Sequence, residues 1–186
     1  MPTPMRMRRW LGGRPRNSGN TSRGSTSKAL TAALNSGLKV SFEVDQVIGK
    51  TVGLIEENFH DKGIGIKVAC TGDPLINGFP NEFGQVIFNL LMNAKCAFIE
   101  RGVSDAWITI SSRVQDGRAV VTVTDNAGGI KEQILQKIFD AFFTTRELGK
   151  GSGVGLFIAK NIIEKQMGGR LSARNVDGGA EFRIEV

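Results

Sequence analysis

NEFGQVIFNLLMNAKCAFIERG, residues 81–102, is the longest helical pattern in the chain. Its apolar residues recur every three or four positions, which predicts a helix of about 20 residues with one buried face. That face comprises Phe83, Ile87, Leu90, Leu91, Ala94, Ala97 and Phe98. Gln85, Asn89 and Asn93 recur at every fourth position and predict a polar stripe beside it. Buried amides cost free energy unless they are bonded, so the stripe indicates either a binding site or a solvated, asparagine-rich face.

Helical and strand patterns alternate on both sides of this stretch. The expected helices are 27–34, 45–59, 81–102, 131–138 and 154–166, and the expected strands are 64–70, 107–112, 118–125, 171–175 and 180–186. Asp116-Gly117 is a dipeptide typical of hairpin turns and predicts that the second and third strands pair. Cys70 falls on the expected core face of the first strand. The pattern predicts an α+β fold, a two-layer sandwich with helices on one face of a mixed sheet.

Length and composition limit the choices further. The chain has 186 residues, 40% of them apolar and 23% charged, which suits one sizeable globular domain with a tail. The sequence contains neither an apolar run of about 18 residues nor the apolar centre of a signal peptide. The chain has two cysteines, Cys70 and Cys96, and one histidine, too few for a disulfide framework or an ordinary zinc site. We therefore expect a cytoplasmic chain with reduced thiols.

The net charge of +6 is unevenly distributed along the chain. Residues 1–42 contain eight basic residues and no acidic one, whereas the remainder has a net charge of −2. Residues 1–36 are also rich in glycine, serine and proline, so we expect a basic, disordered arm before a domain at 37–186. The same composition is also typical of a linker, of the start of a truncated chain, of a mitochondrial transit peptide or of an arm that binds nucleic acid. The near-neutral remainder gives no reason to expect nucleic-acid binding by the domain.

Two further patterns indicate nucleotide chemistry. In VVTVTDNAGGI, Asp125 shares the inward face of a strand with Val121 and Val123, where its carboxylate could accept from an adenine amine. Gly151, Gly153 and Gly155 alternate where a loop enters a helix, a position at which free backbone N–H groups favour phosphate. Since no strand leads into this run and no GxxxxGK[ST] motif occurs, the sequence fits neither a Rossmann fold nor a P-loop.

The order of four motifs resembles a known family. NLLMNA, DNAGGI, FDAFFTTR and GSGVGL look like the ATP-binding motifs of the catalytic domain of sensor histidine kinases, in the GHKL superfamily that also holds gyrase, MutL repair proteins and large heat-shock chaperones. The likeness covers roughly residues 40–186 and is closest to the nitrogen-regulation type. It implies a Bergerat-type ATP-binding fold, with ATP and Mg²⁺ as cofactors.

The resemblance also implies roles for single residues. Asn93 would bind Mg²⁺, Asn89 would support the phosphates, Asp125 would bind the adenine amine and Gly129 would let the backbone approach the base. The segment from Phe139 to Lys150 would be a lid that Phe142 and Phe143 pack down, and Arg146 would neutralise phosphate charge. Catalytic roles fall to Asn89 and Arg146. The remaining expected nucleotide contacts are Phe143, Thr144, Thr145, Lys150, Gly151, Ser152, Gly153, Val154, Gly155 and Leu156.

Three positions depart from the family pattern. Ala127 stands where a glycine is usual, Cys96 where many relatives have a lysine, and Ala180 where a threonine commonly helps a water reach the base. Each departure is expected to lower nucleotide affinity without removing the pocket. The Cys96 thiol also suits an inert position at the edge of the core.

The resemblance implies phosphoryl transfer to a histidine that this chain lacks. Gyrase-like relatives have a water-activating glutamate where this sequence has Asn89, so a histidine acceptor is favoured over water. His60, the only histidine, follows a helix and suits a surface or capping role. The expected partners are an acceptor-histidine dimerisation domain and a response regulator. The fragment is expected to be monomeric, the full-length protein a dimer, and any membrane attachment to come from upstream segments. A regulatory ATP-binding module of the anti-sigma type and a mitochondrial-type protein kinase are the alternatives.

Overall fold

The computed structural model describes residues 39–72, 74–146 and 151–186. Its strands are β1 (Val40–Glu43), β2 (Gly65–Cys70), β3 (Leu75–Gly78), β4 (Trp107–Gln115), β5 (Arg118–Asp125), β6 (Arg170–Val176) and β7 (Gly179–Glu185). Its helices are α2 (Val44–His60), α3 (Pro80–Arg101) and α4 (Gly155–Asn161), with a 3₁₀ turn η1 (Glu132–Ile134) and a π-helical turn η2 (Ile162–Gln166). The expected helix at 27–34 and the arm at 1–36 lie outside the described residues, so the domain boundary stays a prediction.

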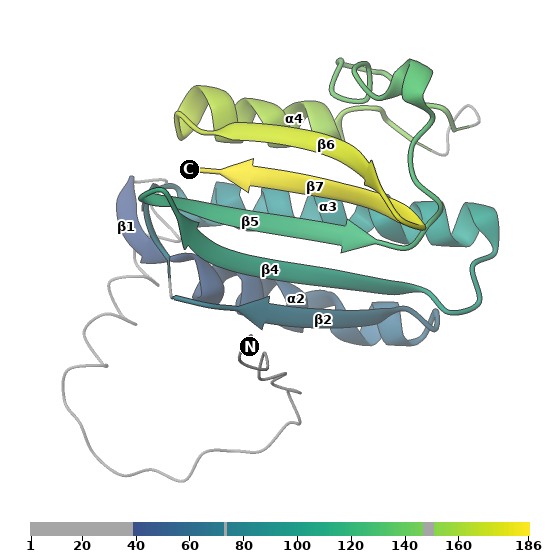
Figure 1. Ribbon diagram of the computed structural model, residues 1–186, viewed down its shortest axis with the longest axis horizontal. Helices are drawn as coiled ribbons and strands as arrows, with labels where there is room; N and C mark the ends of the chain where they lie inside the picture. The colour runs from purple at the N-terminus through teal and green to yellow at the C-terminus, as the bar shows by residue number, and fades with distance from the viewer. Residues whose placement is uncertain (1–38, 73, 147–150) are drawn as a thin grey trace, which may run out of the picture.

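A five-stranded mixed sheet forms one layer, in the order β2-β4-β5-β7-β6. β2 pairs with β4 in parallel, and the other neighbours are antiparallel. The three α-helices lie on one face of this sheet (Figure 1). The predicted α+β, two-layer class is therefore confirmed.

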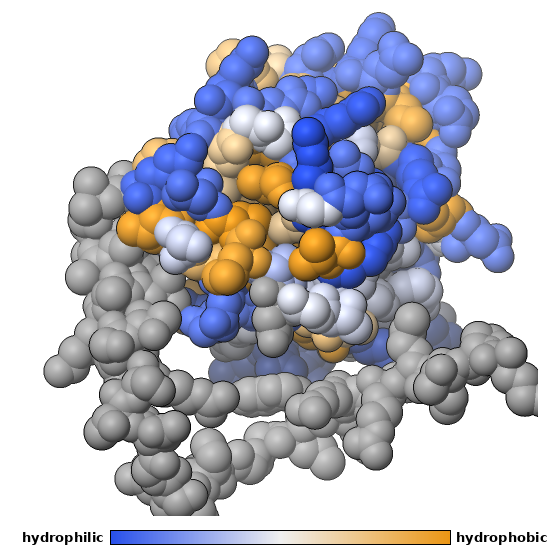
Figure 2. Space-filling model, turned by 60° about the vertical axis from the view of Figure 1, so that its left-hand side comes forward, coloured by the Kyte–Doolittle hydropathy of each residue, from blue (hydrophilic) through white to orange (hydrophobic). Residues whose placement is uncertain are grey.

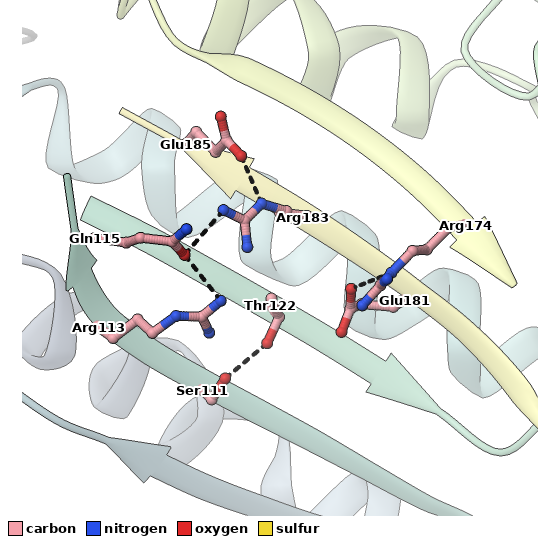
Figure 3. A network of polar contacts seen from close by, with 8 residues as sticks. All are labelled: Ser111, Arg113, Gln115, Thr122, Arg174, Glu181, Arg183 and Glu185. Carbon is pink, nitrogen blue, oxygen red and sulfur yellow. Dashed lines mark hydrogen bonds and ion pairs between the residues drawn. The ribbon is translucent and has the colours of Figure 1, made fainter. Parts of the chain in front are cut away.

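The core fills the space between the helices and the inner face of the sheet. Phe59, Phe83 and Phe182 are among its largest fully buried side chains. The outer face is polar, because alternate residues of β4, β5, β6 and β7 form hydrogen bonds and ion pairs there, including Arg183 with Glu185 and Arg174 with Glu181 (Figure 3). This separation follows from the period of two in the strands.

The long helix α3 forms one residue earlier at each end than the predicted segment 81–102. Pro80 occupies the first turn of α3, where its missing N–H costs nothing, and Gly102 caps the other end in the left-handed region. α2 extends one residue beyond the predicted segment at each end. The hairpin turn at Asp116-Gly117 forms as predicted, with φ of 51° and 75° at its two residues.

The structure differs from the sequence-based prediction at three elements. β1 and β3 were not predicted; they pair antiparallel, with Val40 opposite Gly78, as a separate two-stranded sheet at one end of the molecule. The helix expected at 131–138 was wrong in extent, because only the 3₁₀ turn η1 forms there. The helix expected at 154–166 begins as α4 and then widens into the π-helical turn η2. Figure 2 shows the β1 end of the molecule, where apolar and hydrophilic side chains are mixed at the surface.

Candidate nucleotide-binding site

A cavity of about 650 Å³ opens between α3, the loop after β5 and the segments before and at the start of α4. Its volume is typical of sites for small molecules and cofactors. Thirteen of the predicted site residues line it: Asn89, Asn93, Asp125, Gly129, Phe143, Thr144, Thr145, Arg146, Gly151, Ser152, Gly153, Gly155 and Leu156. The sequence therefore located the cavity, although its segments lie up to about 90 positions apart in the chain.

Two rows of side chains on α3 form one wall. The first row is Phe88, Met92, Cys96 and Glu100, and the second is Asn89, Asn93, Ala97 and Arg101. Members of each row are four positions apart, so they lie above one another on the same side of the helix. The Asn89 side chain donates from Nδ2 to the Gly155 carbonyl, 3.1 Å away, and thereby joins α3 to the start of α4.

Asp125 forms the floor of the cavity at the end of β5. Its side chain is 5% exposed, and its Oδ1 accepts from the N–H groups of Ala127 at 2.9 Å and Ala180 at 3.3 Å. Among the described residues, no side chain or backbone group bonds to Oδ2. One carboxylate oxygen is thus fixed by the protein, while the other is left for a ligand that donates a hydrogen bond.

The environment of Asp125 shifts its titration. Burial raises the pKa of this carboxyl above its ordinary value, because desolvation disfavours the charged form. The N–H groups of Ala127 and Ala180 and the positive charge of Arg101 lower the pKa and oppose the effect of burial. A buried carboxyl in a cleft, perturbed by desolvation and by a specific cation, is a candidate functional group.

Gly179 brings β7 against the backbone of Asp125. A Cβ at this position would lie 1.7 Å from the Asp125 carbonyl oxygen, closer than any side chain permits. The glycine was not singled out from the sequence, and only the pairing of β5 with β7 reveals the close approach. Its absence of a side chain lets the Ala180 N–H reach Asp125.

The glycine-rich segment forms the opposite side of the cavity. Gly153 has a φ of +64°, and a Cβ there would lie 2.5 Å from the Phe142 carbonyl carbon, so both conformation and space require glycine. Val154 was predicted to bind the cofactor, but it does not line the cavity; it is the N-cap residue of α4. Lys150, also a predicted contact, lies outside the described residues.

The segment after η1 is partly anchored. The Phe139 ring packs edge-on against Phe182 with centroids 6.4 Å apart, and the Lys160 ammonium lies 4.7 Å from its ring centre. Phe143 packs on the core and lines the cavity as predicted. Phe142 was wrongly expected to pack, because it is 78% exposed with a φ of 64°.

Arg146 lines the cavity but is already paired with a carboxylate. Its Nε lies 2.8 Å from Glu100 Oε1, and their side chains are 21% and 49% exposed. Glu100 was not predicted as a site residue. The pair connects the last described residue before 147–150 to the final turn of α3, so Arg146 does not face a phosphate site as a free cation in this conformation.

An apolar part of the cavity was missed by the sequence reasoning. Met92, Ile130, Ile134 and Ile138 line it together with Leu156. Their arrangement suits the faces of a planar aromatic ring, since apolar side chains dominate such pockets while a few polar groups set orientation. The spacing of Ile130, Ile134 and Ile138 by four was the signal that could have revealed them.

The three departures from the family pattern all lie at the cavity. Cys96, Ala127 and Ala180 are lining residues. Ala127 and Ala180 contribute their backbone N–H groups to Asp125, which an alanine does as well as a glycine or threonine. Gly129 faces Asn175, since a Cβ at Gly129 would lie 2.8 Å from the Asn175 Oδ1 atom.

Other predicted features lie elsewhere. Gln85 lines a separate, largely apolar hollow of about 360 Å³ between α2 and α3, so the predicted stripe divides between two cavities. His60 ends α2 in an exposed position and lines neither cavity.

Cys70 is half-buried against the core, where burial raises the pKa of its thiol to about 11. Within the described residues, no helix has the length and hydropathy needed to span a bilayer.

Comparison with known proteins gives a consistent result. Residues 78–186 match the family model of histidine kinase-, DNA gyrase B- and HSP90-like ATPases. The two-component sensor PprA of Pseudomonas aeruginosa is 33% identical over 139 residues, which cover 73% of this chain and 15% of PprA. The chain spans less than a third of the length of the curated relatives it matches first.

Solved structures agree with the sequence relatives. The nucleotide-free catalytic domain of histidine kinase ThkA aligns with a TM-score of 0.69 and 29% identity, covering 80% of this chain and 95% of that domain. A structure of ThkA in complex with the response regulator protein TrrA shares the fold, with a TM-score of 0.64, 23% identity and coverage of 88% and 48%. The chain belongs to the family of histidine kinase-, DNA gyrase B- and HSP90-like ATPases, as an ATP-binding catalytic domain of the sensor histidine kinase type.

Proposed function

We propose that this chain binds Mg²⁺-ATP in the cavity beside α3 and donates the γ-phosphoryl group to a histidine on a dimerisation helix outside the chain, in two-component signal transduction. The observation that carries the proposal is the convergence of Asn93, Asp125 and Gly153 on one cavity. The Asn93 amide suits a metal ion, the buried Asp125 carboxylate suits the base, and the backbone around Gly153 suits phosphate.

The base end of the site is formed by Asp125 and the apolar side chains around it. The free Oδ2 would accept from the exocyclic amine of adenine, while Oδ1 stays bound to the protein. A guanine presents a carbonyl at the corresponding position and would leave the carboxylate without a donor. Sites that bind a specific polar group reject analogues lacking it, so this arrangement favours ATP over GTP.

The phosphate end is formed by α3 and the segment from Gly151 to Gly155. Asn93 would bind Mg²⁺ through its side-chain oxygen, and Asn89 would support the phosphates from the next turn. Among the described residues, no group of three His, Cys, Asp or Glu side chains could hold a metal ion. Mg²⁺ needs few protein ligands, because it usually keeps several waters and is held together with substrate phosphates. When bound, the ion neutralises charge that develops on the transferred phosphoryl group.

The remaining lining residues complete the nucleotide site. Thr144, Thr145 and Ser152 would donate hydroxyl hydrogen bonds to phosphate or ribose oxygens, and Phe143 would cover the base side. Lys150 remains a proposed phosphate contact. Arg146 would serve as the phosphate cation once its pairing with Glu100 is exchanged for the nucleotide.

A histidine acceptor is favoured over water by the side chains at the site. Asn89 cannot act as a general base, and in the part of the chain that the structure describes the carboxylates that line the cavity are Asp125, fixed at the base end, and Glu100, paired with Arg146. His60 lies outside the cavity, so the acceptor would come from another segment. Phosphoryl transfer needs mainly positioning and charge neutralisation, which this site offers.

The partners follow from the same proposal. We infer a domain at 37–186 that works with an acceptor-histidine dimerisation domain and then a response regulator, as the complex of ThkA with TrrA suggests for that relative. The full-length protein would be a dimer in the cytoplasm, with any membrane attachment upstream. We expect no nucleic acid as a partner.

The test is transfer of label to a separate acceptor. The protein is incubated with Mg²⁺ and γ-labelled ATP together with a purified dimerisation hairpin that carries the acceptor histidine. The proposal predicts acid-labile label on the hairpin, lost with Asn93→Ala and retained with Asn81→Ala, an exposed asparagine of the same helix outside this cavity. Nucleotide binding without transfer to any cognate hairpin would contradict the kinase role and favour a regulatory ATP-binding module.

A further inference from the structure

Arg101 connects the end of α3 to the loop that follows Asp125. It is the last residue of α3 and continues the cavity-lining row of Asn89, Asn93 and Ala97. Its Nη1 donates to the Gly129 carbonyl at 2.8 Å and to the Ala127 carbonyl. One guanidinium nitrogen thus holds two carbonyls of the same short loop.

The loop between these carbonyls is held in shape from both sides. On one side, a Cβ at Gly128 would lie 3.2 Å from the Arg101 Nη1 atom, so the guanidinium sits directly against this backbone. On the other side, Asn175 of β6 accepts from the Ile130 N–H and donates to the Ile130 carbonyl, both at 2.7 Å. A planar guanidinium, whose N–H directions are fixed, is suited to hold converging carbonyls, which a rotating lysine ammonium does less specifically.

The same contacts lead directly to Asp125. Ala127, whose carbonyl accepts from Arg101, donates its N–H to the Asp125 Oδ1 atom. The positive charge of Arg101 also stabilises the ionised Asp125 carboxylate against the effect of burial. Within residues 39–72, 74–146 and 151–186, the other charged side chains that line the cavity are Glu100, Lys131 and Arg146, and Glu100 and Arg146 neutralise each other.

We propose that Arg101 is a positioning residue for adenine recognition: its guanidinium clamps the loop after Asp125 and thereby holds the Ala127 N–H against that carboxylate. The inference rests on the proposed binding of ATP at this site and adds a specificity residue to it. Arg101 acts through Asp125 and the loop.

The experiment separates the clamp from the charge by three substitutions. Arg101→Gln removes the charge, Arg101→Lys keeps the charge without the planar fork, and Arg118→Gln removes an equal charge from an exposed residue of β5 outside the cavity. Binding of Mg²⁺-ATP and Mg²⁺-GTP is measured by calorimetry from pH 5.5 to pH 8. The nucleotide titrates equally with every variant, so its contribution cancels in the ratio of affinities.

Arg101→Gln is expected to weaken Mg²⁺-ATP binding about tenfold or more at pH 7.5, on the scale of losing a supporting contact, and to reduce the preference for ATP over GTP. Without the cation, the Asp125 carboxyl takes up a proton at higher pH. The ratio of Arg101→Gln to Arg118→Gln affinity should therefore be lower at pH 5.5 than at pH 7.5. Arg101→Lys should lose affinity but show no such additional fall.

Equal affinity and pH dependence for Arg101→Gln and Arg118→Gln would overturn the inference. A loss of affinity that is the same at every pH would contradict the role of the charge. Absence of Mg²⁺-ATP binding by the unsubstituted protein would instead overturn the proposed function itself. Amide hydrogen exchange at residues 126–130 tests the clamp without nucleotide: faster exchange in Arg101→Gln is expected, and unchanged exchange would refute the clamp.

Discussion

Asp125 is a residue at which stability and binding make opposite demands. Burial raises the pKa of its carboxyl, so the folded protein binds a proton there more readily than the unfolded chain does. This group therefore makes the fold more stable when protonated, and that contribution is lost as the pH rises through the folded pKa. At neutral pH the ionised side chain costs stability, and only its proposed role toward adenine explains why a carboxylate stands there.

Asp125→Asn should consequently separate the two properties. Since the introduced amide would be neutral and could still accept from Ala127 and Ala180, we expect the melting temperature at pH 7 to stay the same or rise. Mg²⁺-ATP affinity should fall, and the preference for ATP over GTP should fall with it. Calorimetry measures the affinities for ATP and GTP, and thermal unfolding measures the melting temperature. Equal losses for ATP and GTP, or a clearly lower melting temperature, would contradict the role given to Asp125.

The ion pair between Glu100 and Arg146 leads to a prediction about nucleotide affinity. Glu100 is half-exposed, so the pair contributes at most about 1 kcal/mol to stability. Its carboxylate both holds Arg146 and adds negative charge to a cavity proposed to receive a triphosphate. Glu100→Gln should therefore tighten Mg²⁺-ATP binding by about two- to tenfold at low salt and leave adenosine binding unchanged.

The matched control is Glu56→Gln, an exposed glutamate of α2 outside the cavity. It should leave both affinities unchanged. Weaker Mg²⁺-ATP binding by Glu100→Gln would show that the ion pair orders the site, contrary to the competition described here.

Among the elements, the segment from Gly151 to Gly155 has a strict backbone requirement. A Cβ at Gly153 would meet the Phe142 carbonyl carbon at 2.5 Å and the Phe143 carbonyl oxygen at 2.7 Å, and backbone atoms cannot rotate away as a side chain does. Gly153→Ala should lower Mg²⁺-ATP affinity by about tenfold or more while the core, which Gly153 does not enter, stays folded.

Gly53→Ala is the control for that substitution. Gly53 lies in the exposed face of α2, where an added Cβ would meet nothing within 4 Å. Alanine there should raise the free energy of unfolding by about 0.5–1 kcal/mol without affecting binding. Denaturant unfolding and calorimetry distinguish the two outcomes. Wild-type affinity in Gly153→Ala would contradict a backbone-defined phosphate site.

The sequence predicts elements with strong local patterns and misses those set by distant contacts. α3 differs from its predicted bounds by one residue at each end, because its apolar period is a local signal. β1 and β3 have four residues each and exist through their mutual pairing, which no local pattern encodes. η2 widens a regular helical pattern, and the sequence gives no sign of it.

The candidate site shows the same division. Asn89, Asn93, Asp125 and the glycines were predicted as site residues because their types and spacing suit nucleotide chemistry, and they line one cavity. Arg101 belongs to the same four-residue spacing as Asn93, but the expected stripe was restricted to amides and therefore ended too early. Gly179 could not be found locally, because its importance comes from a strand 54 positions away.

At the scale of the whole molecule, the fold brings three distant segments to one cavity. The parallel and antiparallel pairing places the end of β5 below α3, and the Asn89 contact with Gly155 places α4 against the other side. Both the proposed function and the role of Arg101 require this cavity to bind magnesium and a purine nucleotide together.

The affinity of Asn93→Ala for Mg²⁺-ATP, measured by calorimetry beside the unsubstituted protein and Asn81→Ala, tests that claim most directly. The expected result is a loss of tens-fold or more in Asn93→Ala, on the scale of removing a metal ligand, and no change in Asn81→Ala. Removing Mg²⁺ should weaken ATP binding by the unsubstituted protein and leave that of Asn93→Ala nearly unaffected. Equal affinity of Asn93→Ala and the unsubstituted protein for Mg²⁺-ATP would contradict the account.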